Sequence, residues 1–150
     1  MRDGTLIKDA RIFDGTGAPW FRSDLLISGG RIARMAPNLA ASGAAVVRAE
    51  DRYLAPGFIG RLVRPGWFNL EDAVRRMTSA TAQRFNLPDR GVIREGLAAD
   101  LTLFDAAIDD HATFDDPVQF GTGVSHVFVN GDAVLADGKP TGRLPGRVIP

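Results

Sequence analysis

The 150-residue chain has the size of a single compact domain, with 45% hydrophobic and 24% charged residues. Eighteen basic and 18 acidic side chains give a formal net charge of zero, so we expect neither a nucleic-acid partner nor a membrane partner. The chain has no cysteine, which excludes disulfides and thiolate catalysis, and its two histidines are too few for a histidine-rich dinuclear metal site.

Apolar runs in this sequence are short. None approaches the length that a secretory signal or a membrane-spanning helix requires. We therefore expect a cytoplasmic protein.

The first part of the chain carries strand and turn signals. Residues 6–13 mix polar and apolar side chains at short period and end in the turn-forming cluster 14–17, which predicts a first strand. Residues 24–28 and 31–35 flank Gly29 and Gly30, a pair that tolerates the positive φ of a hairpin turn. Two short strands are predicted at 45–48 and 53–55, and Pro56 and Gly57 end the pattern.

The middle of the chain has a helical period instead. One amphipathic helix is predicted from about 70 to 85, because apolar positions recur at helical spacing and include Leu70, Ala73, Val74 and Met77. Asn69 can cap its first turn, and Pro88 lies just beyond its last turn.

Strand signals return after Gly91. Residues 100–105, 124–129 and 133–136 are predicted strands, and the last two flank Asn130 and Gly131. Asn-Gly is among the strongest hairpin signals, because both residues tolerate the left-handed conformation of a type I′ turn. A tail rich in glycine and proline covers residues 139–150. The fold class predicted from these elements is mainly β with one helix.

Both histidines have a structural and a functional interpretation. His111 lies among Asp109, Asp110, Asp115 and Asp116, and such an oxygen-rich cluster can hold a hard cation, but the adjacent Pro117 favours a solvated acidic loop. His126 alternates with Val127 and Val129 on a predicted strand, a pattern typical of a structural histidine. We assign a role to neither.

Other chemistry-bearing residues also favour structural interpretations. Ser79 lies on the predicted helix without a glycine-flanked elbow, so we expect it on the helix surface. The arginines between residues 61 and 94 are interleaved with acids and predict a mixed solvated face. The residues by themselves identify no catalytic, no substrate-binding and no metal-ligating residue.

Several stretches of the sequence resemble those of a known protein family. Residues 6–17, 24–33 and 54–59 are similar to the N-terminal segment of the amidohydrolase superfamily, and residues 91–105 and 124–131 are similar to its closing segment. The ending 138–147, GKPTGRLPGR, resembles the D-aminoacylase, or N-acyl-D-amino-acid deacylase, branch. The resemblance covers nearly the whole chain.

This resemblance implies a small β-sandwich built from residues 1–59 and 91–150. In the family, a (β/α)₈ barrel with a zinc site runs between the two segments, and such a barrel takes about 250 residues. Here Phe58 and Ile59 are followed by Gly60 and Arg61 rather than by the family's His-x-His metal motif. Residues 60–90 resemble the last barrel helix and its connections, so the junction near Gly60 has the form of a large internal deletion.

The family's chemistry depends on that barrel. Its metal polarises an amide carbonyl and activates water while a barrel aspartate transfers the proton. None of these groups corresponds to a position in this chain, so we expect no cofactor in it and no hydrolysis of N-acyl-D-amino acids by the chain alone.

Two other hypotheses remain open. The first is a non-catalytic interaction or assembly module, in which the helix face Leu70, Val74 and Met77 is either folded onto the sandwich or buried in a homo-oligomer. The second is a residual metal-assisted hydrolase that uses the acidic loop around His111.

Overall fold

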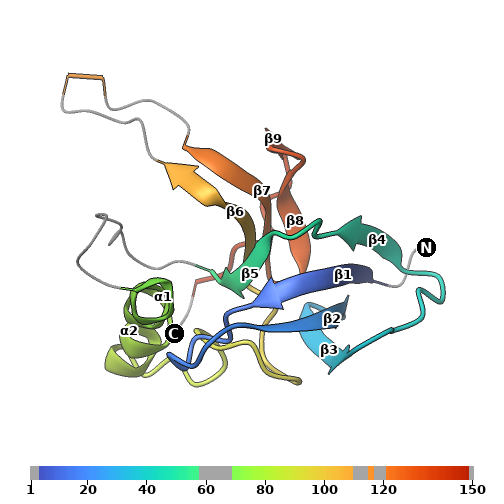
Figure 1. Cartoon of the computed structure of the whole chain (residues 1–150), viewed down its shortest axis with the longest axis horizontal. Helices are drawn as coiled ribbons and strands as arrows, with labels where there is room; N and C mark the ends of the chain where they lie inside the picture. The colour runs from blue at the N-terminus through green and yellow to red at the C-terminus, as the bar shows by residue number, and fades with distance from the viewer. Residues whose placement is uncertain (1–3, 58–68, 110–114, 117–120, 149–150) are drawn as a thin grey trace.

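A computed structural model describes residues 4–57, 69–109, 115–116 and 121–148 (Figure 1). Its elements are, in chain order, β1 (Thr5–Ile12), β2 (Phe21–Ser28), β3 (Arg31–Ala36), β4 (Ala45–Arg48), β5 (Tyr53–Pro56), α1 (Leu70–Met77), α2 (Ser79–Arg84), β6 (Leu101–Asp109), β7 (Thr122–Val129), β8 (Asp132–Ala136) and β9 (Lys139–Pro140). The predicted mainly-β class is confirmed, and each predicted strand is present.

All the strands belong to one sheet. Its order is β3-β2-β1-β5-β6-β7-β8-β9, and β4 pairs with β1 beside β5. The N-terminal strands β1 to β5 and the C-terminal strands β6 to β9 are joined by the antiparallel pair β5 and β6, in which Leu54 lies opposite Leu103. The two chain segments expected to share one sandwich are therefore hydrogen-bonded to each other.

The sheet curls so that two of its hairpin turns come into contact. The β2–β3 turn at Gly30 and the β7–β8 turn at Gly131 both bind Ala99, whose N–H donates to the Gly30 carbonyl at 3.0 Å and whose carbonyl accepts the Gly131 N–H at 3.0 Å. One core fills the curl and combines both halves of the chain, with Ile7, Ile12, Leu25, Ile27, Ile32, Leu54, Leu101, Leu103 and Phe128. The structure thus has a single curled sheet around this core, which is consistent with the predicted β-sandwich.

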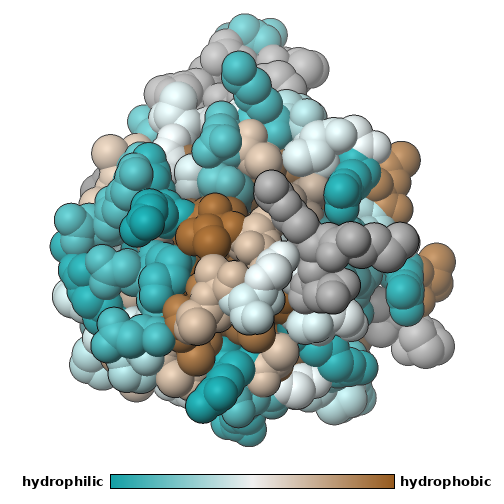
Figure 2. Space-filling view, turned by 90° about the vertical axis from the view of Figure 1, so that its right-hand side faces the viewer, coloured by the Kyte–Doolittle hydropathy of each residue, from teal (hydrophilic) through white to brown (hydrophobic). Residues whose placement is uncertain are grey.

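The surface on one side of the molecule has both hydrophilic and hydrophobic areas. Seen from the side where β4 and the N-terminus lie in Figure 1, the surface is largely hydrophilic around a hydrophobic area in its middle (Figure 2). Val46 of β4 is one of the exposed large hydrophobic side chains, at 47%.

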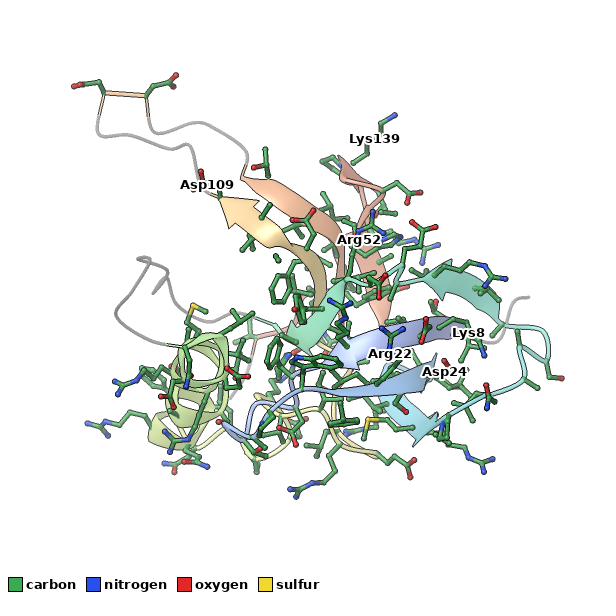
Figure 3. All side chains as sticks on the ribbon, viewed as in Figure 1. Lys8, Arg22, Asp24, Arg52, Asp109 and Lys139 are labelled. Carbon is green, nitrogen blue, oxygen red and sulfur yellow. The ribbon has the colours of Figure 1, made fainter. Side chains whose placement is uncertain are left out.

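A bulge in β1 is held by Asp24. Asp9 has a φ of 57°, and the register between β1 and β2 shifts between Ile7 and Ala10. The buried Asp24 carboxylate accepts the Asp9 N–H and the Leu39 N–H, each at 2.8 Å, and the Lys8 ammonium at 2.5 Å (Figure 3). Burial raises the pKa of Asp24, but these hydrogen bonds outweigh burial and leave its pKa below the usual 3.8.

Replacing Asp24 by asparagine is expected to cost about 2 kcal/mol in the free energy of unfolding, because an amide gives the Lys8 ammonium no counter-charge and fewer acceptor sites. Urea unfolding of D24N at neutral pH measures the loss. The control is D132N, which removes one surface carboxylate paired to Arg143, and we expect a change within about 0.5 kcal/mol for it. Equal losses in the two variants would contradict the role given to Asp24.

The predicted helix is present but is divided at Thr78. The Asn69 side chain caps α1 as predicted, since its Oδ1 accepts the Asp72 N–H at 2.8 Å. At Thr78 the backbone leaves the helical region, with φ −125° and ψ −89°. The Thr78 hydroxyl donates to the Val74 carbonyl at 2.7 Å and the Ser79 hydroxyl to the Gly15 carbonyl at 2.5 Å. The break therefore fixes the helix pair to the loop after β1.

The apolar helix face packs on the sheet of its own chain. Val74 is fully buried, Met77 is 4% exposed and Leu70 is half-buried. Val74 joins Phe13, Ala55 and Phe104 in a second, smaller core. Of the two outcomes expected for this face, the structure has the one in which it folds onto the sheet, and homo-oligomer formation stays a prediction.

In the part of the chain that the structure describes, no helix has the length and apolar character needed to cross a membrane.

Candidate functional site

A hollow lined by polar and apolar side chains lies where the sheet divides. β4 pairs only with β1, whereas β6 continues beyond its pairing with β5 and pairs with β7. The opening between them, here called the His126 hollow, has a volume of about 610 Å³. Its polar lining comes from both sides of the division and includes Arg48, Glu50, Arg52, Asp105, Ser125, His126 and Asp137. The label in Figure 3 places Arg52 between β5 and the C-terminal strands.

His126 is the most buried ionisable group of this hollow. It is 9% exposed, and its ring stacks parallel to Phe128 with centroids 6.1 Å apart. Its Nδ1 lies 3.3 Å from the Ser125 hydroxyl and its Nε2 lies 3.8 Å from the Asp137 carboxylate. The Ser125 hydroxyl donates to the Leu103 carbonyl at 3.1 Å, so its proton is already used. His126 is thus held mainly by residues of its own strand, β7.

Burial lowers the pKa of His126 below the usual 6.5. The nearby Asp137 raises this pKa and Arg52 lowers it, but burial dominates. The ring is therefore neutral at pH 7. A neutral ring that uses its Nδ1 proton on Ser125 leaves only a lone pair toward Asp137, so only the protonated ring can bind both neighbours.

The stability of the chain is expected to fall as the pH drops from about 7.5 to about 5.5, because the unfolded histidine takes up a proton that folded His126 resists. H126Q removes this difference and should show a shallower loss of melting temperature over the same range. D137N removes the group that raises the pKa and should show a steeper loss. Identical pH profiles for the wild type and H126Q would contradict the assignment.

Zinc does not fit the donors in the described residues. A catalytic zinc site uses about three protein ligands. In the described ranges no group of three or more His, Cys, Asp or Glu side chains could hold a metal ion. His126 and Asp137 form one imidazole–carboxylate pair, which falls short of such a site.

The acidic loop is only partly within the described residues. Asp109 ends β6, and Asp115 and Asp116 are exposed. His111 and Asp110 lie outside the described residues, so the metal-site interpretation of this loop stays a prediction.

Ser79 corrects an expectation from the sequence. It is 6% exposed rather than on the helix surface, and its hydroxyl binds the Gly15 carbonyl. Since a buried hydroxyl on a backbone carbonyl has no base beside it, this contact is structural.

A second polar cluster, the Arg90 latch, consists of Arg90, Asp100, Asn130 and the carbonyl of Pro145. Arg90 binds the Asp100 carboxylate through Nη1 and donates from Nη2 to Asn130 Oδ1 at 3.0 Å. The Asn130 N–H donates to Asp100 at 2.7 Å, and its Nδ2 donates to the Pro145 carbonyl at 2.8 Å. The latch ties the connection after α2 to the β7–β8 turn and the C-terminal tail. The sequence pattern gave no sign of it, since Arg90 belonged to a predicted solvated face.

A third cluster lies on the surface of β1, β2 and the β4–β5 turn. The Arg11 guanidinium lies over the rings of Trp20 and Tyr53, at 5.3 and 5.5 Å, and donates to Asp51 at 2.9 Å. Arg22 also binds Asp51, and its hydrogen bond and the charge of Arg11 hold the pKa of Asp51 below 3.8. These contacts order an exposed turn.

Comparisons with known proteins show which proteins this sequence resembles. The amidohydrolase family model matches residues 62–135. The D-aminoacylase of Alcaligenes xylosoxydans xylosoxydans is 43% identical over 96 residues, which are 63% of this chain and 20% of that protein. Over these residues the chain resembles the amidohydrolase family. The N-acyl-D-aspartate deacylase of the same organism is 45% identical over 83 residues, or 54% of this chain and 16% of that protein.

Solved D-aminoacylase structures are also similar to this chain. A D-aminoacylase crystal structure is 46% identical and covers 52% of this chain and 17% of its own, with a TM-score of 0.50. A D-aminoacylase variant in complex with copper chloride is also 46% identical, covers 56% and 18%, and has a TM-score of 0.54. The chain therefore spans about a fifth, or less, of the relatives it matches.

The family match begins close to the predicted junction. It starts at residue 62, two residues after Gly60, and continues through both helices and into β8. The segment that resembles the last barrel helix is thus part of one continuous match with the closing strands.

Proposed function

We propose that this chain is the β-sheet portion of a D-aminoacylase-like amidohydrolase and that it does not hydrolyse N-acyl-D-amino acids by itself. The supporting observation is the extent of the match, which is 43% identical to a D-aminoacylase but covers only 20% of it. In a full-length enzyme the sheet would support the barrel, and the barrel would supply the metal and the activated water.

The path of the chain supports the same proposal. β5 ends beside the start of β6, where the Gly57 N–H donates to the Asp100 carbonyl at 2.8 Å. The helix pair begins at Leu70 and packs beside β5 through Ala55. Residues 58–69 therefore occupy the place in the chain order where the family has a barrel of about 250 residues.

The ionisable side chains are consistent with a sheet that supports the barrel and does not itself carry out hydrolysis. Amide hydrolysis needs a polarised carbonyl and an activated water. Three of the described ionisable groups instead hold structure: Asp24 fixes the β1 bulge, Arg90 fixes the β7–β8 turn, and His126 stacks on Phe128.

The test is an assay of the purified chain with a panel of N-acetyl-D-amino acids and added zinc, in which free amino acid is measured. A full-length D-aminoacylase purified in the same way is the positive control. We expect no release above the blank without protein. Turnover that copurifies with the chain, disappears on chelation and returns with zinc would overturn the proposal.

A further inference from the structure

The hairpin turn at Asn130 and Gly131 combines a reactive sequence with a structural role. A backbone nitrogen that follows asparagine can attack the carboxamide carbon, and glycine obstructs this attack least because it has no side chain. In the structure the same turn belongs to the Arg90 latch and touches the β2–β3 turn. One residue pair is thus both chemically labile and a contact point of the curled sheet.

We propose that Asn130 is a deamidation site that the C-terminal tail protects. In this reaction the Gly131 nitrogen bonds to Asn130 Cγ, the Cγ–Nδ2 bond breaks, and ammonia leaves with the proton of the Gly131 N–H. Water then opens the cyclic imide at either carbonyl and gives aspartate or isoaspartate. Water is the only co-reactant, so no metal, oxidant or enzyme is needed.

The closed latch blocks this reaction at each reacting group. The Gly131 N–H donates to the Ala99 carbonyl at 3.0 Å, which keeps its proton in place. Asn130 Oδ1 is held by Arg90 at 3.0 Å and its Nδ2 by the Pro145 carbonyl at 2.8 Å. The carboxamide therefore cannot rotate toward Gly131 until at least the Pro145 contact opens.

The tail is the part of the latch that opens most readily. Its side chains Leu144 and Val148 are 94% and 96% exposed, so little apolar burial holds it. Beyond the short pairing of β9 with β8, three surface contacts attach it to β8: Thr141 N–H to the Val134 carbonyl at 3.0 Å, the Thr141 hydroxyl to the Ala133 carbonyl at 2.7 Å, and Arg143 to Asp132 at 2.6 Å. Segments held by exposed hydrogen bonds open at low free energy.

The product would not restore the original contacts. An aspartate at position 130 has no donor for the Pro145 carbonyl. Isoaspartate adds one carbon to the main chain of a turn that has no spare room, since a Cβ on Gly131 would lie 2.7 Å from the Gly30 Cα. Deamidation would therefore release the tail and loosen the contact between the two hairpins, in one direction only.

The first experiment follows deamidation of the full chain at mildly alkaline pH by peptide mapping and mass spectrometry. We expect Asn130 to react at least about tenfold more slowly in the folded chain than in urea, because the latch must open first. T141V/R143A weakens the tail contacts and should raise the folded rate several-fold. Equal rates in the folded and the unfolded wild type would overturn the protection, and an unchanged rate in folded T141V/R143A would overturn the role of the tail.

The second experiment tests the consequence without waiting for the reaction. Hydrogen exchange at the Thr141 amide should be several-fold faster in N130D than in the wild type. N86D is the matched control, because it introduces the same charge at an exposed left-handed asparagine outside the latch. Exchange at Thr141 that is unchanged in N130D, or equally fast in N86D, would overturn the coupling between Asn130 and the tail.

Discussion

G131A is expected to destabilise the chain by about 3 kcal/mol, which is a large fraction of a typical domain stability. Gly131 has a φ of 82°, where alanine is strained, and its added Cβ would lie 2.7 Å from the Gly30 Cα and 3.0 Å from Ile27 Cγ2. Backbone atoms form the closest contact, so the two hairpin turns must separate. Urea unfolding measures the loss.

The control for this variant is G29A. Gly29 lies in the other hairpin turn with a φ of 57°, and an added Cβ there meets nothing within 4 Å. G29A therefore has the conformational strain without the collision, and about 1 kcal/mol is expected. If G131A were no worse than G29A, the contact between the hairpins would contribute nothing to the closure of the sheet.

F104A is expected to cost about 3–5 kcal/mol and to lower the melting temperature by about 10 °C. Phe104 is 1% exposed, contacts the Tyr53 ring at a centroid distance of 5.8 Å, and belongs to the core that holds Val74 of α1 against the sheet. Truncation leaves a cavity between the helix pair and β5. We therefore expect F104A to speed up hydrogen exchange more in α1 than in β1.

F85A is the matched control, because Phe85 follows α2 and is 68% exposed. Its substitution should change stability by less than about 0.5 kcal/mol. A loss in F104A as small as that in F85A would mean that the second core does not hold the helices.

The strands were predictable because their signals are local. Gly29-Gly30 and Asn130-Gly131 each specify a two-residue hairpin turn, and the structure has positive φ at all four residues. The Asn69 cap was predictable for the same reason, since it acts on a residue three positions away. The resemblance to the amidohydrolase superfamily could be inferred from six short stretches of sequence, because these stretches surround turns and strand ends of the fold.

The features that the sequence did not predict depend on distant residues. Thr78 divides the helix where Ser79 binds the Gly15 carbonyl, 64 positions earlier in the chain. Arg90 was expected on a solvated face because its neighbours are charged, but its partner Asn130 lies 40 positions later. The His126 hollow likewise needs β4 and β7, whose proximity follows from the curl of the sheet and not from any local pattern.

The direct pairing of β5 with β6 has a consequence for how much the length of the chain between them can vary. The strand that precedes the central stretch and the strand that follows it are neighbours, with Pro56 opposite Leu101. The chain between these strands leaves and rejoins the sheet at one place, so a longer connection there would interrupt no strand pairing. Its cost to the sheet would be a loop-closure entropy that grows only slowly with length.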